Sequence, residues 1–233
     1  MYWNTLFFVI LPYLAMAVFV VGHIWRWRAD QFGWTTRTSE LMEKRWLMWA
    51  APLFHVSTLM VILGHLVGLL IPRSATQALG ISDELYHLFA VGMGLLAGLM
   101  LAAGIAMLIL RRFILKTRIR LITRPADAVL YVLLAVQIII GLGQTFGFGL
   151  FHIVPGFDYR QNVSIWFRSL FYFNPDLVLI SGAPLLFKMH IVASLAILAV
   201  WPFTRLVHVW SMPIGYLTRP PIVYRQKKTD ENN

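Results

Sequence analysis

Five long apolar segments constrain this chain more than any other feature of its sequence. Each holds about 20 or more mostly apolar residues, the length that an α-helix needs to cross a hydrocarbon core of ~30 Å. A segment inside lipid must satisfy its own backbone hydrogen bonds, so we expect each segment to be a membrane-crossing helix. The segments are predicted at residues 3–25, 46–71, 86–110, 126–150 and 184–210. The predicted fold is therefore an all-α integral membrane protein.

Composition agrees with this fold class. Of the 233 residues, 59% are hydrophobic and 13% are charged, whereas an ordinary soluble domain is about 45–50% apolar. The formal net charge of +10 comes from basic residues in short loops, so we explain it by membrane topology and predict no nucleic-acid partner. We expect one five-helix domain over residues 1–225 and a polar cytoplasmic tail over residues 226–233.

The basic residues predict an orientation, because Lys and Arg are enriched in cytoplasmic loops. Most of the 20 Lys and Arg residues follow the first, third and fifth segments, on one side of the membrane. They are Arg26, Arg28, Arg37, Lys44, Arg45, Arg111, Arg112, Lys116, Arg118, Arg120, Arg124, Arg205, Arg219, Arg225, Lys227 and Lys228. The other side carries Arg73, Arg160 and Arg168. We therefore expect a multi-pass protein of the cytoplasmic membrane, with its N-terminus outside and its C-terminus in the cytoplasm.

Two segments need separate interpretation. The first apolar segment has no basic residue before it, so we expect a retained helix and not a cleaved signal peptide. Residues 151–182 form a long connection on the side predicted to be external, and we expect this connection to fold over the outer membrane face.

Four of the seven histidines are predicted to lie at membrane depth, where an ionisable side chain is costly and indicates function. His55 and His65 are ten residues apart in the second segment, about 15 Å along a helix. His190 and His208 are eighteen residues apart in the fifth segment, about 27 Å and five whole turns, so we expect them on one helix face. These distances exclude a common ion between two histidines of the same helix. The other three histidines are predicted nearer to water: His23, His87 and His152.

The two segments run in opposite directions, which predicts pairs formed between helices. His65 should meet His190 near the outside, and His55 should meet His208 near the cytoplasm. The two separations along the helices differ by about 12 Å. We expect helix tilt and a bend at Pro202 to absorb this difference.

Two histidines per site suit haem better than a bare ion. Zinc takes about four ligands, and the second and fifth segments contain no Cys, Asp or Glu. A haem iron lacks only two axial ligands, so the inventory predicts two b-type haems between the second and fifth helices, with electron transfer as their task. Small residues near the histidines leave room for a macrocycle: Ser57, Thr58, Gly64, Gly68, Ala193 and Ser194. The alternative is hydrogen bonding between helices by four histidines without a cofactor.

Three arginines are predicted at the inner membrane edge, where the propionates of an inner haem would emerge. They are Arg111, Arg112 and Arg205. A guanidinium can bind a carboxylate through two hydrogen bonds. The alternative is that these residues only contribute positive charge to the cytoplasmic side.

Two motifs resemble a known family. Phe54-His55 is followed by Gly64-His65, with nine residues between the two histidines, and the fifth segment ends in the stretch FTRLVHVWSMP, residues 203–213. This pattern, with Asp30-Gln31-Phe32, resembles the gamma subunit of membrane-bound respiratory nitrate reductase, its cytochrome b subunit. The likeness covers nearly the whole chain. It implies a diheme quinol-oxidising subunit that anchors an iron–sulfur beta subunit and a molybdenum-containing alpha subunit on the cytoplasmic side, where nitrate is reduced to nitrite.

The resemblance also implies roles for single residues. His65 and His190 would hold the outer (distal) haem, and His55 and His208 the inner (proximal) haem. Arg111 matches a family arginine near the inner haem. Quinol from the bilayer would be oxidised beside the outer haem, at Gly64, His65 and Gly68.

One position departs from the family pattern. Known members have a lysine at the outer start of the third segment that assists quinol binding, and Leu85 stands there in this chain. We hypothesise that His87 replaces this lysine as hydrogen-bond partner or proton acceptor, since an exposed histidine takes up a proton near neutral pH. The alternative is that His87 is a surface histidine that caps the start of the third helix.

The implied reaction moves electrons inward while quinol releases protons outside. The chain contains no cysteine, so an iron–sulfur cluster that accepts the electrons must belong to another chain. Three alternatives stay open: the same haem module serving a sulfur-compound or heterodisulfide reductase, a transporter with a histidine proton relay, and a purely structural membrane anchor.

Overall fold

A computed structural model describes residues 2–34, 42–115, 117–154, 156–211 and 218. Within these residues all regular structure is helical, without a β-strand. Five helical rods are long and apolar enough to cross a membrane, which confirms the predicted all-α fold with five apolar segments. They are Tyr2–Ala29, Arg45–Leu70, Asp83–Leu115, Pro125–Leu150 and Leu185–Phe203. The predicted polar tail, residues 226–233, lies outside the described residues.

Most rods join an α-helix to a short segment of different helical pitch. The first combines α1 (Tyr2–Thr5), the π-helix η1 (Leu6–Ile10) and α2 (Leu11–Ala29), and the 3₁₀ turn η2 (Gln31–Gly33) follows. The second rod is α3 (Arg45–Leu70). The third is α5 (Asp83–Ile109) with the π-helix η3 (Leu110–Leu115), and the fourth is α7 (Pro125–Gln144) with the π-helix η4 (Thr145–Leu150).

The fifth rod and the connections complete the chain. The rod is α10 (Leu185–Val200) with the 3₁₀ turn η5 (Trp201–Phe203), and the 3₁₀ helix η6 (Arg205–Ser211) follows. Four short helices join the rods: α4 (Arg73–Ala78), α6 (Thr117–Leu121), α8 (Val163–Phe171) and α9 (Leu177–Ser181).

Local sequence signals explain where several helices begin. The Ser82 hydroxyl accepts a hydrogen bond from the Leu85 backbone N–H (3.2 Å) at the start of α5, and acidic residues fill the first turn. Both features stabilise a helix N-terminus. Pro125 occupies the first turn of α7, where its missing N–H costs nothing. The Asp176 carboxylate accepts from the Val178 N–H (2.9 Å) at the start of α9.

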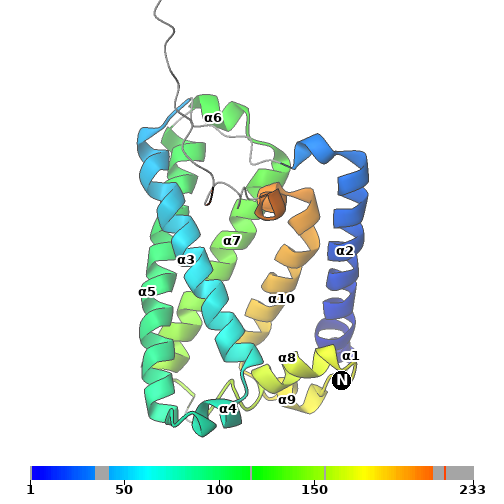
Figure 1. The fold of residues 1–233 in the computed structure, drawn as a ribbon, viewed down its shortest axis with the longest axis vertical. Coiled ribbons are helices and arrows are strands. Elements are labelled where there is room, and N and C mark those ends of the chain that lie inside the picture. The colour runs from blue at the N-terminus through cyan, green and yellow to red at the C-terminus, as the bar shows by residue number, and fades with distance from the viewer. Residues whose placement is uncertain (1, 35–41, 116, 155, 212–217, 219–233) are drawn as a thin grey trace, which may run out of the picture.

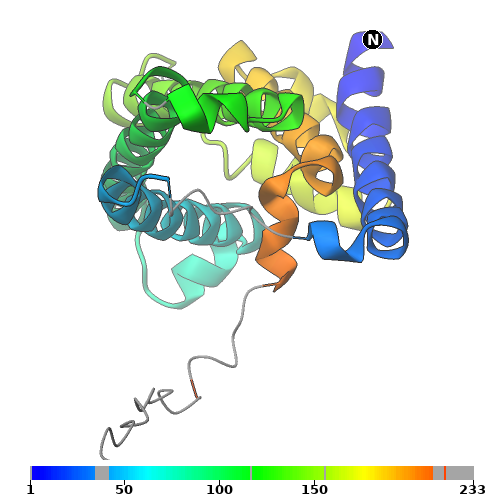
Figure 2. The same ribbon diagram turned by 90° about the horizontal axis from the view of Figure 1, so that it is seen from above.

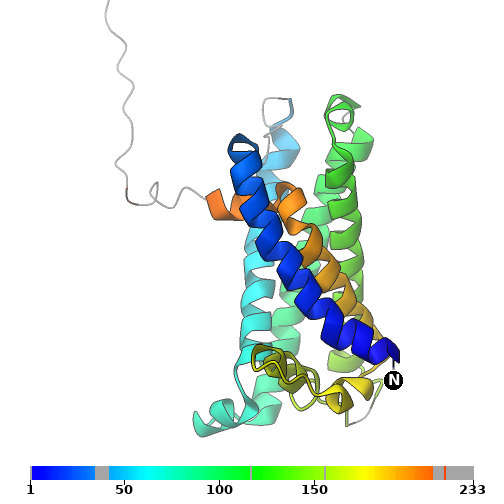
Figure 3. The same cartoon turned by 90° about the vertical axis from the view of Figure 1, so that its right-hand side faces the viewer.

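The long helices pack side by side in the order α3, α5, α7, α10 and α2, so the first long helix of the chain lies next to the last. α3 packs along α5, α5 along α7, α7 along α10, and α10 along α2. Figure 2 shows the resulting curved arrangement, and Figure 3 shows α2 leaning across its outer side. Within these described helices, α3 and α10 do not pack closely against each other. α5 and α7 connect α3 to α10 around the bundle and hold their backbones apart.

The two ends of the bundle differ. We call the end that carries α1, α4, α8 and α9 the N-terminal end, and the end that carries α6 and η6 the opposite end (Figure 1). The predicted connection, residues 151–182, contains α8 and α9 and lies across the N-terminal end. A buried cluster that includes Phe8, Trp166 and Ile180 fixes it there. The Trp166 indole N–H donates to the Phe8 carbonyl (3.1 Å), which joins α8 to the first rod.

The fifth segment is shorter than predicted. Its α-helix ends at Val200, and the chain passes through η5 and an extended Thr204 (φ −114°, ψ −178°) before η6 begins. Pro202 has no backbone N–H for a helical bond and so favours this break. The predicted bend at Pro202 is therefore confirmed, whereas the prediction that His190 and His208 share a face of one helix is wrong.

Candidate functional site

The predicted inner pair, His55 and His208, lies toward the opposite end of the bundle. His55 comes from α3 and His208 from η6. Their ring centres are 6.0 Å apart and their planes are 80° apart. On one straight helix, His208 would lie too far from His190 to pair with His55. Because η6 turns away from the axis of α10, His208 lies beside His55 instead.

The predicted outer pair, His65 and His190, lies nearer the N-terminal end. His65 is in the last turns of α3, and His190 is in the second turn of α10. Their ring centres are also 6.0 Å apart, with planes 18° apart. The structure thus brings together both pairs that the antiparallel segments predicted. One histidine in each pair comes from α3, and the other comes from the fifth rod or the segment after it.

Backbone carbonyls hold three of the four imidazoles. The Nδ1 atoms of His55, His65 and His208 lie 2.7, 2.8 and 2.6 Å from the carbonyl oxygens of Ala51, Val61 and Arg205. A carbonyl can only accept, so Nδ1 carries the proton in each ring and Nε2 keeps its lone pair. Metal-binding histidines have this arrangement, in which the second ring nitrogen donates to a carbonyl.

His190 is held differently. Its Nε2 lies 3.0 Å from the Gln137 amide nitrogen, and this nitrogen also lies 2.6 Å from the Ser194 hydroxyl oxygen. The Ser194 hydroxyl donates to the His190 carbonyl (2.8 Å). His190 Nδ1 and the Gln137 amide oxygen are buried and have no hydrogen-bond partner among the described residues. A metal at His190 Nε2 would replace the bond from Gln137.

The spacing within each pair suits one metal between two imidazoles. A bond from an imidazole nitrogen to a metal is about 2 Å long and the ring centre lies about 1 Å further, so two imidazoles on opposite sides of a metal have centres about 6 Å apart. In the part of the chain that the structure describes, no three His, Cys, Asp or Glu side chains gather in a group that could hold a metal ion. A site with two protein ligands therefore fits haem iron, whose other four ligands come from the porphyrin.

The space beside the histidines is only partly as predicted. A Cβ at Gly64 would meet nothing within 4 Å, so the room predicted there is present. Gly68 is buried instead, and a Cβ there would lie 3.0 Å from the Tyr159 hydroxyl. Ser57 is also fully buried, and its hydroxyl donates to the Leu53 carbonyl (2.6 Å). Gly68 and Ser57 therefore pack against neighbouring segments and do not leave space for a macrocycle.

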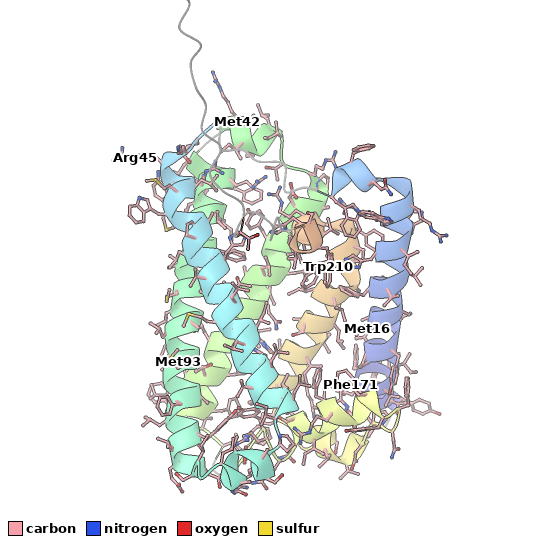
Figure 4. The ribbon with its side chains drawn as sticks, viewed as in Figure 1. Met16, Met42, Arg45, Met93, Phe171 and Trp210 are labelled. Atoms are coloured by element: carbon pink, nitrogen blue, oxygen red, sulfur yellow. The ribbon has the colours of Figure 1, made fainter. Side chains whose placement is uncertain are left out.

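A groove adjoins the outer pair. Its volume is about 340 Å³, and it is lined by His65, Gln137 and Ser194 together with apolar residues of α3 and α8. Two of the apolar residues, Phe167 and Phe171, lie on α8. Figure 4 shows Phe171 at the N-terminal end. The groove therefore combines an apolar wall with a few polar groups, which is typical of sites for small organic molecules.

The three predicted propionate-binding arginines are paired with carboxylates of the chain itself. The buried Arg111 Nε lies 2.7 Å from a Glu43 carboxylate oxygen. Arg205 forms two hydrogen bonds to the Asp127 carboxylate (2.9 and 2.7 Å), and Arg112 Nη1 lies 3.7 Å from the same carboxylate. A buried ion pair offsets the cost of removing these charges from water. The predicted propionate contacts stay predictions.

His87, the predicted substitute for the family lysine, faces another histidine. Its ring stacks on His152 with centres 5.3 Å apart. The adjacent Tyr86 is nearer to the outer pair, because its hydroxyl would lie 3.5 Å from a Cβ at Gly68, one helical turn from His65. The hydroxyls of Tyr86 and Tyr159 are 3.2 Å apart and form a hydrogen bond. Burial raises the pKa of Tyr159, and this hydrogen bond raises it further.

Sequence reasoning missed two polar groups near the histidines. Gln137 contacts His190, and Asp127 binds Arg205, three residues before His208. Both stand in the fourth apolar segment, Asp127 at its beginning and Gln137 in its middle. Polar residues in a membrane helix usually face other protein groups. That signal could have identified both.

The fold and these pairs define a class: a five-helix membrane protein with two histidine pairs between nonadjacent rods. Comparisons with known proteins agree with this class. The family described as nitrate reductase gamma subunit matches residues 4–227. The chain therefore belongs to the nitrate reductase gamma subunit family.

Individual relatives match over most of the chain. The nitrate reductase gamma chain of Bacillus subtilis is 44% identical over 218 residues, which are 94% of this chain and 96% of that relative. The respiratory nitrate reductase 1 gamma chain of Escherichia coli is 31% identical over 217 residues, 93% of this chain and 94% of the relative. The nitrate reductase-like protein NarX of Mycobacterium tuberculosis is 46% identical over 228 residues, 97% of this chain. The chain spans about a third of NarX, since the match covers 34% of that relative.

Proposed function

We propose that this chain is the cytochrome b subunit of a respiratory nitrate reductase. It would oxidise quinol near the outer pair and deliver electrons to an iron–sulfur beta subunit in the cytoplasm. A molybdenum-containing alpha subunit would then reduce nitrate to nitrite. Two b haems would supply one-electron transfer, the outer one held by His65 and His190 and the inner one by His55 and His208. Family membership and the histidine geometry support this proposal.

One observation carries most of the proposal: two histidine pairs with the same 6.0 Å spacing follow each other along one bundle. Hydrogen bonding between histidines would not require this spacing, since a direct bond between ring nitrogens brings the rings closer together. In the rings of His55, His65 and His208, Nδ1 is bonded to a carbonyl and Nε2 has no hydrogen-bond partner among the described residues, which also favours metal ligands over bridges between helices.

The groove beside His65 supports quinol binding at the outer pair. Phe167 and Phe171 give it an apolar wall, and Gln137 and Ser194 provide polar atoms within an apolar site. Such groups orient a ring that carries two hydroxyls. His87 stays our proposed quinol hydrogen-bond partner or proton acceptor, with Tyr86 as the competing group because of its contact with Gly68.

Haem content tests the assignment directly. We expect two b-type haems per chain in the purified complex, seen in the dithionite-reduced spectrum. His65→Ala should remove the outer haem and His55→Ala the inner haem, and each change should stop electron flow from quinol to nitrate. His152→Ala is the matched control, because this histidine lies outside both pairs, and it should keep both haems.

Several results would contradict the proposal. A purified complex without reduced b-type absorption would favour the proton-relay transporter. Unchanged electron flow after His65→Ala would favour a structural anchor. If both haems are present, turnover of His87→Ala and Tyr86→Phe with quinol decides which group assists the substrate. Unchanged turnover in His87→Ala would disprove the proposed role of His87.

A further inference from the structure

The break at the end of α10 leaves backbone groups that need partners. A helix terminus exposes carbonyl oxygens without intrahelical donors, and here the chain leaves its helix at Val200 inside a packed bundle. Pro202 and Thr204 are both buried. The position of η6, and with it His208, depends on what binds this turn.

Arg26 of α2 binds the turn directly. Its Nη1 donates to the Pro202 carbonyl (2.6 Å) and to the Thr204 carbonyl (3.0 Å). Its Nη2 donates to the Gly33 carbonyl (3.0 Å), so the same guanidinium also holds η2. One side chain thus connects three carbonyls on two segments far apart in sequence. Hydrogen bonds from a charged donor are stronger than those between neutral groups.

A second set of contacts joins η6 to the same part of α2. The Trp210 indole N–H donates to His23 Nε2 (3.0 Å), and His23 Nδ1 lies 2.6 Å from the Phe19 carbonyl. Trp210 belongs to η6, and Figure 4 shows it on the side of η6 toward α2. The Ser211 hydroxyl donates to the Trp34 carbonyl (3.1 Å). These bonds fix η6 on both sides of His208, before it through Arg26 and after it through Trp210.

Close packing leaves little freedom at this contact. A Cβ at Gly22 would lie 2.8 Å from Pro202 Cγ, so α2 touches the turn where Gly22 has no side chain. The contact lies one helical turn from Arg26. It therefore brings the guanidinium within reach of the carbonyls of the turn.

We propose that α2, which contributes none of the four paired histidines, positions the inner ligand His208 through Arg26 and the His23–Trp210 bond. Arg26 is thus a positioning residue for the inner haem site, and this inference rests on the proposed function. Losing the Arg26 bonds would free the turn at Pro202 and let His208 move relative to His55. The outer pair does not depend on this contact, since His190 lies within α10 itself.

The test measures the two haems separately in the purified complex. His208→Ala and His190→Ala, each expected to keep one haem, provide reference spectra for the outer and inner haem. We expect Arg26→Gln to weaken haem binding at the inner site by about 10- to 100-fold, as for other groups that orient metal ligands. The outer haem should keep its spectrum and midpoint potential. Trp210→Phe, which keeps an aromatic ring but loses the N–H, should also weaken haem binding at the inner site.

Arg28→Gln is the matched control, because Arg28 is an exposed arginine in the same last turn of α2. It should leave both haems unchanged. If Arg26→Gln also leaves both haems and their potentials unchanged, the inference is wrong. Equal loss of both haems would overturn it too, since Arg26 would then stabilise the whole bundle and not the inner site. Wild-type protein without haem would instead refute the proposed function.

Discussion

Each imidazole of the two pairs has two ring nitrogens, and in three of the four the backbone assigns their roles. The carbonyls of Ala51 and Val61 lie one helical turn before His55 and His65 and accept a hydrogen bond from Nδ1–H. This bond joins residues of the same helix, so any helical histidine whose side chain adopts a suitable rotamer can form it. His190 lacks such a bond and depends on Gln137 of α7. The orientation of His190 therefore depends on a neighbouring helix, whereas that of His55 depends on its own helix.

Gly141 provides a test at the residue scale. A Cβ at this position of α7 would lie 3.0 Å from His190 Cε1, so Gly141→Ala should push the imidazole out of its place. We expect weaker haem binding at the outer site, by about 10-fold or more, with the inner haem unchanged in the reduced spectrum.

Gly143 of the same helix is the control for this change. A Cβ there would meet Leu186 Cδ2 at 3.5 Å, an ordinary contact. Gly143→Ala should therefore keep both haems. A Gly141→Ala protein with an unaltered outer haem would show that His190 can move aside without losing its role as ligand.

At the scale of elements, the position of α3 matters most because it carries one histidine of each pair. α3 lies directly against α5, and the two backbones approach closely at Gly104, where a Cβ would lie 2.8 Å from the Phe54 backbone nitrogen. Small residues at helix crossings let backbones approach in membranes. The Gly104 contact thus fixes α3 at the turn that carries His55, next to Phe54.

Gly104→Ala should destabilise the bundle. Backbone atoms of Phe54 cannot rotate away, so α3 and α5 must separate, at a cost of about 1–3 kcal/mol that is typical of overpacking. We expect a lower midpoint of thermal unfolding in detergent. The substitution should also disturb the inner haem more than the outer one, because Phe54 adjoins His55.

Gly92 of α5 gives the opposite expectation. A Cβ there would meet nothing within 4 Å, and alanine favours a helix over glycine by up to about 1 kcal/mol. Gly92→Ala should keep or raise the unfolding midpoint. Equal effects at Gly92 and Gly104 would mean that the close approach of α3 and α5 does not limit stability.

At the scale of the whole molecule, the two ends of the bundle carry different charge. Basic residues gather at the opposite end, and three of the buried or half-buried arginines there pair with Glu43 and Asp127. The N-terminal end is covered by α8 and α9. We propose that the N-terminal end faces outward and the basic end faces the cytoplasm and the iron–sulfur partner.

The natural absence of cysteine makes this orientation simple to measure. Val178 in α9 and Leu121 in α6 are 79% and 77% exposed, at the N-terminal and opposite ends. We expect a membrane-impermeant maleimide to label Val178→Cys in intact cells, and Leu121→Cys only after the cells are opened. The unsubstituted chain, with no thiol, is the control. The reverse labelling pattern would contradict the predicted orientation.

Much of the fold could be predicted from hydrophobicity, since a membrane span is a local property of about 20 residues. The first four segments begin and end within a few residues of the predicted positions, apart from extensions such as η3, where Arg111 and Arg112 are buried by pairing. The antiparallel order of the spans also predicted the correct histidine pairs. Sequence periodicity could not predict that the fifth helix ends at Val200, because the break is stabilised by Arg26 and Gly22, far away in the chain.

The sequence by itself therefore determined the class of protein, the number of spans and which histidines can meet, because these depend on apolar length, chain direction and residue type. Tertiary structure decided how they meet. It turned η6 toward α3, directed Gln137 at His190, buried Gly68 under Tyr159 and paired the arginines with Glu43 and Asp127. These features depend on contacts between helices distant in sequence, and only the packed bundle brings those side chains together.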